Sequence, residues 1–160
     1  QQARTHRVGV SFDVQSMRYT GKRIANAEAS SESVEELFYL RPVGHYNDRF
    51  GKKYEYTERA RKADIVNCAL AMQVYQAKID NAGFSEEHAR ACLPFDFRQH
   101  FVVSFTMRAL MHFLDLRAKA DAQLEIQQLC ELMMPHFEDW APEIAAWYKK
   151  SRWKKALLAP

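Results

Sequence analysis

The segment from residue 58 to residue 82 has the longest regular pattern of apolar residues in the sequence. These residues recur every three or four positions, which places them on one face of an α-helix. Gly83 follows at a point where a helix C-terminus commonly needs glycine. The pattern predicts one long helix over 58–82. Its expected buried stripe is Ile65, Ala69, Met72, Tyr75 and Ile79.

Strand patterns occur in three short segments. Residues 6–14 alternate between apolar and polar types, which is typical of a strand that is buried on one face. Its polar face carries Arg7 and Ser11, so we expect that face to border a site. Residues 101–105 predict a second strand, and residues 37–40 a short one that stops before Pro42. The apolar face of the first strand would be Val8, Val10, Phe12 and Val14.

The second half of the sequence is predicted to be mostly helical. Thr106 is a suitable N-cap for a helix over 106–117, and Asp121 for the next helix. Pro142 suits the first position of a last helix, which ends in a basic tail. The expected buried stripes are Leu110, Phe113 and Leu114 in the first of these helices and Ile126, Leu129, Cys130 and Met133 in the second.

Two further segments are less regular. Ser85 is expected to cap a short helix with Glu86 and Glu87 in its first turn, ending at Pro94. Residues 21–36 are polar and rich in Ala, Ser and Glu, which predicts an excursion over the surface.

With no internal repeat and no linker, residues 1–160 are expected to form a single domain. Its fold class would be α+β, with mixed helix and antiparallel sheet and more helix than strand.

Composition and charge exclude several kinds of protein. Hydrophobic residues make up 48% and charged residues 27% of the 160 residues, as in soluble globular proteins. No apolar run approaches the roughly 20 residues that cross a bilayer. A net charge of +3 is far below that of a typical nucleic-acid-binding domain. The three cysteines and six histidines show no metal-ligand spacing, so we expect no metal. The cysteines are odd in number and widely spaced, which predicts no disulfide framework and a reducing, cytoplasmic location.

Cations and hydroxyl groups surround the first predicted strand. Arg4, His6 and Arg7 precede it, and Ser16 and Arg18 follow it. Arginine forms bidentate hydrogen bonds with phosphate, and a serine hydroxyl adds another, so this set suits an anionic ligand. Taken alone, the pattern fits a solvated charged edge at least as well.

A second set of cations lies on the predicted helix over 106–117. Arg108 and His112 are four residues apart and therefore share a helix face. Arg117 is nine residues beyond Arg108 and would face the opposite way in an unbroken helix, so we expect it at or past the helix end. A histidine beside an apolar stripe, taken alone, is more often an interior residue than a catalyst.

In this order, the two sets resemble the motifs of flavin-dependent thymidylate synthases. That family carries an Arg-His-Arg signature that leads to Ser-x-Arg-Tyr and follows a Gln. Its second half carries Ala-Arg-x-x-Leu-Pro, a strand, an Asn-x-Arg helix motif ending in Leu-Arg, and Ala-Gln-x-Glu-Ile. Residues 89–94 and 108–126 follow this second pattern closely, and the resemblance spans residues 1–128. The first pattern is supplied by Gln1, Arg4, His6, Arg7, Ser16, Arg18 and Tyr19.

The resemblance implies the reductive methylation of dUMP to dTMP. Methylenetetrahydrofolate would supply the carbon, and hydride would pass from NADPH through FAD. It also implies a homo-oligomer, expected to be a tetramer, with active sites shared between subunits. Members of the family have an N-terminal portion that precedes the first motif, and this sequence begins inside that motif at Gln1, so we expect the natural N-terminus to lie upstream.

The same resemblance assigns roles to individual residues. Ser16, Arg18 and Arg90 would hold the dUMP phosphate, Arg90 from a neighbouring subunit. Arg117 would be the catalytic cation that contacts the uracil ring and favours its ionised form. The full set expected at dUMP is Gln1, Arg4, Gln15, Ser16, Met17, Arg18, Arg90 and Arg117. The set expected at FAD is Arg4, His6, Arg7, Thr106, Arg108 and His112.

The sequence departs from the family pattern at four positions. Thr5 lengthens the first motif by one residue, Val14 replaces an acidic residue, Thr106 an asparagine and Asp121 a histidine. These differences leave two alternatives open: a pyrimidine-nucleotide hydroxymethylase, and a non-catalytic relative that binds nucleotide or nucleic acid. Cations and aromatic residues near the C-terminus favour the second alternative, although a solvated last helix explains them better. They are Trp147, Tyr148, Lys149, Lys150, Arg152, Trp153, Lys154 and Lys155.

Overall fold

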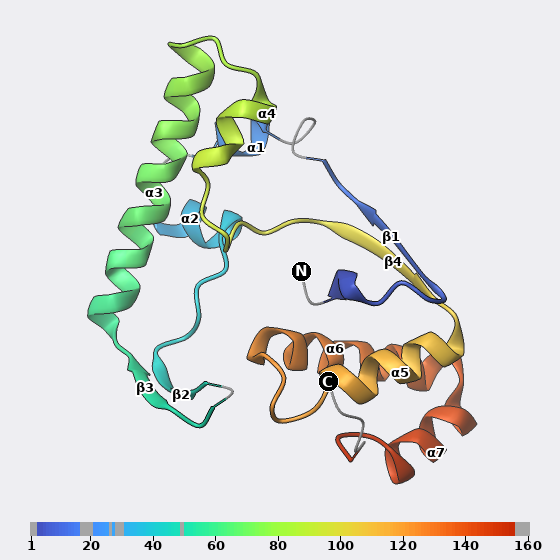
Figure 1. Ribbon diagram of the computed structural model, residues 1–160. Helices are drawn as coiled ribbons and strands as arrows, with labels where there is room; N and C mark the ends of the chain where they lie inside the picture. The colour runs from blue at the N-terminus through green and yellow to red at the C-terminus, as the bar shows by residue number, and fades with distance from the viewer. Residues whose placement is uncertain (1–2, 17–20, 26, 28–30, 49, 156–160) are drawn as a thin grey trace. The chain divides into compact units, whose positions relative to one another are not determined.

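The computed structural model describes residues 3–16, 21–25, 27, 31–48 and 50–155 (Figure 1). These residues form two compact units. Unit 1 contains Gln1–Asp13 and Val102–Pro160, and unit 2 contains Val14–Phe101. Each unit has its own hydrophobic core. The expectation of a single domain over residues 1–160 is not decided by this division and stays a prediction.

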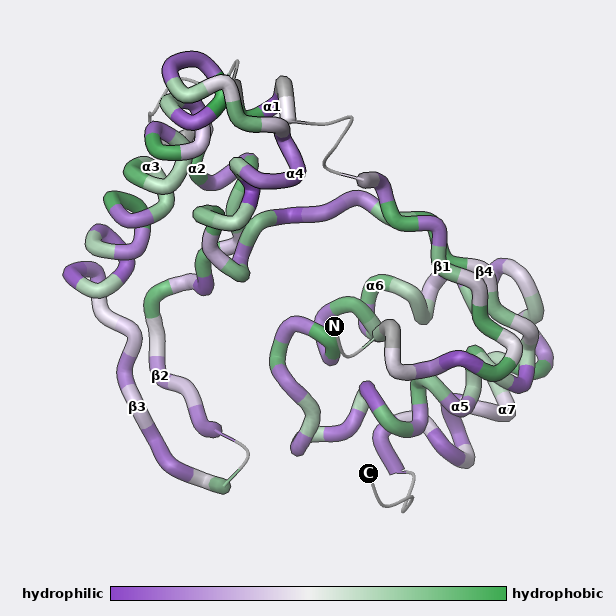
Figure 2. The backbone as a smooth tube through the Cα atoms, turned by 45° about the horizontal axis from the view of Figure 1, so that its top comes forward, coloured by the Kyte–Doolittle hydropathy of each residue, from purple (hydrophilic) through white to green (hydrophobic). Residues whose placement is uncertain are grey.

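The core of unit 2 forms around the long helix α3 (Glu58–Asp80), as the apolar spacing predicts. The Thr57 hydroxyl accepts the Ala60 N–H at 3.2 Å and caps its N-terminus. Beyond the C-terminus, Gly83 has φ +65°, a left-handed conformation that favours glycine. Hydrophobic and hydrophilic residues alternate along the helix in Figure 2. Its fully buried residues are Cys68, Met72 and Tyr75.

Two short helices replace the surface excursion expected over 21–36, and that prediction is wrong. They are α1 (Lys22–Ala25) and α2 (Ser31–Leu37). Ile24 and Val34 are both fully buried in the core of unit 2. Isolated apolar residues within a polar segment are sufficient to anchor such short helices against a larger one. The strand expected over 37–40 is also absent, because α2 includes Leu37 and only Phe38 forms a β-bridge, to Phe97.

A β-hairpin precedes α3, and the sequence patterns did not predict it. Strand β2 (Gly44–Asn47) pairs antiparallel with β3 (Lys53–Tyr56), with Gly44 opposite Tyr56. The Asp48 carboxylate accepts the N–H groups of Phe50 and Lys52 and stabilises the turn. After α3, Ser85 takes the expected N-cap position of α4 (Glu86–Ala89), but its side chain makes no capping hydrogen bond. The 3₁₀ helix η2 (Arg90–Cys92) follows and ends at Leu93.

Strands β1 (Val10–Val14) and β4 (Phe101–Phe105) form a two-stranded sheet. Thr106 donates its N–H to the Gly9 carbonyl at one end, and Gln15 donates to the His100 carbonyl at the other, so the strands are antiparallel. The half-buried positions of β1 are Val10, Phe12 and Val14, as the alternation predicts. The strand begins later than expected, because the short helix η1 (Ala3–Thr5) and a turn precede it, which leaves Val8 92% exposed.

Three helices form the rest of unit 1: α5 (Met107–Arg117), α6 (Leu124–Trp140) and α7 (Pro142–Ser151). Thr106 caps α5 and Pro142 opens α7, as predicted. Asp121 does not cap α6, because that helix begins later, with Gln123 in the N-cap position. The stripe expected on α5 is buried in the core of this unit, as are Ile126 and Cys130 of the stripe expected on α6, whereas Leu129 and Met133 are only partly buried.

The predicted fold class, α+β with more helix than strand and small antiparallel sheets, is confirmed. Among the described residues, no helix combines the length and the apolar character that a membrane-spanning segment needs.

Candidate functional site

Helix α5 carries most of the predicted site residues of unit 1. Arg108 and His112 are both exposed and lie one helical turn apart, so they share a face as expected. Arg117 is the last residue of the helix and is half-buried, which agrees with the expected position at the helix end. The hydroxyl of Thr106 accepts the Ala109 N–H at 3.3 Å at the other end.

The chain before β1 approaches the N-terminus of α5 closely at Gly9. This glycine has φ +68°, and a Cβ placed on it would lie 2.6 Å from Oγ1 of Thr106. Thr106 in turn donates its N–H to the Gly9 carbonyl at 2.9 Å. A side chain at this position would collide with the cap of α5, so glycine allows the two segments to meet.

The short helix η1 brings the first motif to the opposite end of α5. Ala3 packs against the core of unit 1, and the His6 N–H donates to the Ala3 carbonyl at 3.3 Å. Arg4 lies within η1. Its side chain and the whole of Gln1 lie outside the described residues, so their predicted contacts remain predictions.

His6, His112 and Arg117 lie together, and with Thr5 they form what we call the Arg117 cluster. Arg117 donates its Nε–H to Nε2 of His6 at 3.0 Å and an Nη2–H to Oγ1 of Thr5 at 2.9 Å. The His6 ring lies edge-on to His112, with ring centroids 5.8 Å apart, and to Phe113 at 5.0 Å. Residues from both predicted motifs therefore meet in one cluster of unit 1.

The surroundings of His6 favour its neutral form. Burial lowers its pKa below the ordinary 6.5, and the nearby charges of Arg117 and His112 lower it further. The hydrogen bond agrees with this direction, because Nε2 can accept from Arg117 only when it carries no proton. The neutral ring then holds its proton on Nδ1, which remains a donor.

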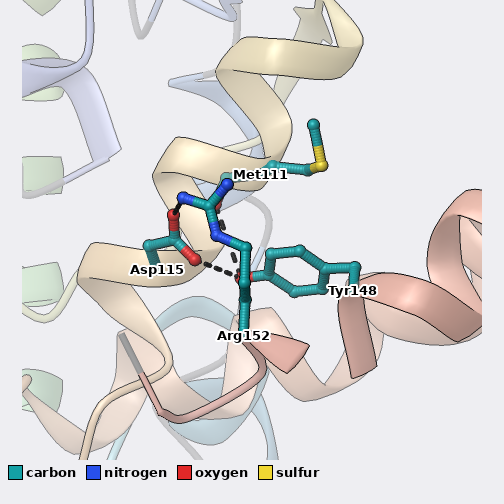
Figure 3. Close-up of polar contacts among 4 residues, drawn as sticks. All are labelled: Met111, Asp115, Tyr148 and Arg152. Atoms are coloured by element: carbon teal, nitrogen blue, oxygen red, sulfur yellow. Dashed lines mark hydrogen bonds and ion pairs between the residues drawn. The ribbon is translucent and has the colours of Figure 1, made fainter. Parts of the chain in front are cut away.

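A buried polar group supports the last turn of α5, and no sequence motif pointed to it (Figure 3). Asp115 is 1% exposed and its carboxylate accepts the Tyr148 hydroxyl at 2.9 Å. The same carboxylate forms an ion pair with Arg152. Burial and the hydrogen bond to Asp115 raise the pKa of Tyr148, so its hydroxyl stays protonated and donates. The signal in the sequence was a carboxylate inside the apolar stripe of a helix.

The remaining residues that are predicted to bind the nucleotide belong to unit 2. Gln15 is exposed and its backbone extends the pairing of β1 with β4, and Ser16 is half-buried. Arg90 is exposed at the start of η2. Met17 and Arg18 lie outside the described residues. Arg7, in unit 1, is exposed before β1.

Cys68 and Cys130 are buried thiols without the properties of an activated nucleophile. Burial raises the pKa of the Cys130 thiol to about 12 and also raises that of Cys68. No group of three or more His, Cys, Asp or Glu side chains among the described residues is placed to hold a metal ion.

Several of the C-terminal cations have partners within unit 1. Lys149 forms an ion pair with Glu138 at 2.5 Å, and Lys154 with Glu131. Arg152 pairs with the buried Asp115. These contacts favour a solvated, internally paired last helix over a surface that binds nucleic acid.

Comparison with known proteins gives a consistent result. The family model described as thymidylate synthase complementing protein matches residues 1–143. A flavin-dependent thymidylate synthase of Haloarcula marismortui is 35% identical over 159 residues, and one of Halobacterium salinarum is 32% identical over 161. Each alignment covers 94% of this chain but 63% of the relative, so the chain spans a little under two thirds of the length of these relatives.

Solved structures share the fold at lower identity. Thymidylate synthase X from Helicobacter pylori, crystallised with FAD and dUMP, matches with a TM-score of 0.64 at 20% identity, over 84% of this chain and 59% of that one. The UMP/dUMP methylase PolB from Streptomyces cacaoi, bound to 5-Br UMP, matches with a TM-score of 0.69 at 20% identity, over 96% and 68%. Together with the family match over residues 1–143, these similarities show that the chain belongs to the thymidylate synthase complementing protein family, the flavin-dependent thymidylate synthases.

Proposed function

We propose that this chain is part of a flavin-dependent thymidylate synthase that converts dUMP to dTMP. Methylenetetrahydrofolate would supply the carbon, and NADPH would supply the hydride by way of bound FAD. The observation that carries this proposal is the Arg117 cluster, in which His6 from the first motif meets His112 and Arg117 from the second. The names of the curated relatives support the same activity.

The described residues of unit 1 suit the binding of FAD. Arg108 and His112 present a guanidinium and an imidazole on one exposed face of α5, and such donors match an anionic diphosphate. Thr106 caps the N-terminus of the same helix, and His6 contacts Arg117 at its C-terminal end. Arg7 follows His6 in the sequence, and Arg4 belongs to η1. When bound, FAD would supply hydride transfer to the nucleotide, while these residues bind and orient it.

Arg117 has the properties that the proposed catalytic role requires. Its guanidinium is half-buried and its hydrogen-bond partners, His6 and Thr5, are neutral groups. A fixed cation of this kind stabilises negative charge that develops on a uracil ring, and it does so more strongly where water is excluded. This is the role that we assign to Arg117.

The nucleotide-binding role is assigned to residues of both motifs. Ser16, Arg18 and Arg90 would hold the phosphate, with Gln1, Arg4, Gln15 and Met17 beside the nucleotide. The exposed position of Arg90 on η2 is compatible with a site in a neighbouring subunit. We therefore propose a homo-oligomer, a tetramer with shared sites, in the cytoplasm.

A product assay tests this function. The full-length protein would be incubated with dUMP, methylenetetrahydrofolate, NADPH and FAD, and the nucleotide analysed by mass spectrometry. The proposal predicts dTMP, with no product when FAD is omitted from protein stripped of flavin. A hydroxymethyl product, which is heavier by one oxygen, would favour the alternative hydroxymethylase. Thr106 motivates that alternative, because its hydroxyl is engaged by the α5 cap where the family has an asparagine.

A further inference from the structure

Thr5 is the residue that lengthens the first motif, and the structure gives its side chain a specific partner. Its hydroxyl accepts an Nη2–H of Arg117 at 2.9 Å, next to the bond from Nε of the same guanidinium to His6. We propose that Thr5 is a positioning residue that, together with His6, fixes the orientation of the Arg117 guanidinium for catalysis. This inference rests on the proposed function of Arg117.

The two bonds fix the plane of the guanidinium. Nε and Nη2 lie on the same edge of this planar group, so two acceptors on that edge prevent rotation about the Nε–Cζ axis and about the last side-chain torsions. Among the described residues, these are the hydrogen bonds that the Arg117 side chain makes. Nη1 lies away from this edge and donates to no acceptor in the part of the chain that the structure describes, so it can contact a ligand.

The acceptors are themselves held in place by the core of unit 1. Ala3, at the start of η1, packs against that core, and the His6 N–H closes the turn to the Ala3 carbonyl. The His6 ring also packs on Phe113, which is 1% exposed. Thr5 lies between these two anchored residues, so its hydroxyl is presented to Arg117 by a fixed backbone.

The chemistry of the acceptors preserves the charge of Arg117. A carboxylate partner would neutralise the cation, as Asp115 does for Arg152 elsewhere in the unit. Within the described part of the chain, no carboxylate forms an ion pair with Arg117; a hydroxyl and an imidazole take that place. The arrangement therefore holds the guanidinium firmly and leaves its positive charge for a substrate in which negative charge develops.

Two substitutions test this role in the full-length enzyme. Thr5→Val keeps the shape of the side chain and removes the hydroxyl, whereas Thr5→Ser keeps the hydroxyl. The first readout is hydrogen exchange at the Arg117 Nε–H, followed by ¹⁵N NMR, which does not depend on any activity. The second is kcat and KM for dUMP in the methylation assay, with the thermal midpoint measured alongside to verify folding.

The proposal predicts that Thr5→Val raises the Nε–H exchange rate and lowers kcat by about tenfold, the effect of losing one hydrogen bond to a charged group. In Thr5→Ser, both the Nε–H exchange rate and kcat should stay within about twofold of the parent values. An unchanged Nε–H exchange rate in Thr5→Val would overturn the proposed contact. Faster exchange with an unchanged kcat would overturn its catalytic relevance. If the unsubstituted full-length enzyme forms no dTMP, the proposed function itself fails, and with it the positioning role.

Discussion

Arg117 donates its Nε–H to Nε2 of His6 at 3.0 Å, although the two residues are 111 positions apart in the sequence. This contact joins the first family motif to the end of α5. It also requires Nε2 of His6 to be unprotonated, because a protonated nitrogen could not accept the hydrogen bond. The predictions below follow from this contact and from the structure that supports it.

Replacing Arg117 with lysine keeps a positive charge but removes the planar group that contacts His6 and Thr5. We expect kcat for dTMP formation to fall by roughly 100-fold, the range seen when one preorganised donor to a developing anion is lost. Steady-state kinetics of the full-length enzyme measure this. Arg59→Lys, an exposed position on α3, is the matched control and should leave kcat unchanged. Comparable losses in both variants would contradict the assigned role.

Acidification should weaken the Arg117 cluster. Because burial lowers the folded-state pKa of His6 below 6.5, the unfolded chain takes up a proton first as the pH falls. The stability that neutral His6 contributes is therefore fully present above pH 6.5 and is lost as the pH falls through its lower folded-state value. Denaturant unfolding between pH 7.5 and 5 should show a smaller pH dependence in His6→Gln than in the parent. An equal dependence of the unfolding free energy on pH in the two proteins would contradict this account of His6.

The network around Asp115 should contribute to stability rather than to chemistry directly. Tyr148→Phe removes a buried donor to the carboxylate, which costs about 1–3 kcal/mol of unfolding free energy. Urea unfolding followed by circular dichroism measures the loss. Tyr46→Phe removes a hydroxyl in the exposed hairpin, where water can replace the lost bond to Pro42, and should change stability by less than about 0.5 kcal/mol. Similar losses of unfolding free energy in the two variants would show that burial does not increase the contribution of the Tyr148 hydroxyl to stability.

Gly9 should tolerate a methyl group less well than another glycine with similar backbone geometry. Gly9 and Gly83 both have positive φ, +68° and +65°, so alanine is strained at either position. Only at Gly9 would the added Cβ collide with Thr106, and Gly83 has open space around it. We expect Gly9→Ala to lose at least about 1 kcal/mol more unfolding free energy than Gly83→Ala. Equal losses of unfolding free energy would show that the Thr106 side chain can shift to accommodate the added methyl group at little cost.

Regular apolar spacing and cap residues made part of this fold predictable from the sequence. The bounds of β4 and α5 agree with the prediction, because Thr106 is a strong N-cap directly after an apolar strand. The β2–β3 hairpin was missed, because its exposed strands lack an apolar face. The start of β1 was wrong, because alternation alone does not reveal the turn at Gly9.

The candidate site was predictable to a similar extent. Spacing placed Arg108 and His112 on one face and Arg117 at the helix end, and the structure agrees. The contacts of Arg117 with Thr5 and His6 depend on tertiary packing between segments far apart in sequence, which no local pattern encodes. The same is true of Asp115, whose partners lie on α7.

The central claim is that one site binds FAD and dUMP together. Its most direct test is the visible absorption spectrum of the purified full-length protein, recorded before and after dUMP is added. The account predicts a flavin band that shifts when dUMP binds, and a shift that weakens in Arg117→Ala. A colourless protein that cannot be loaded with FAD would contradict it, and would favour a relative that binds nucleotide without catalysing its methylation.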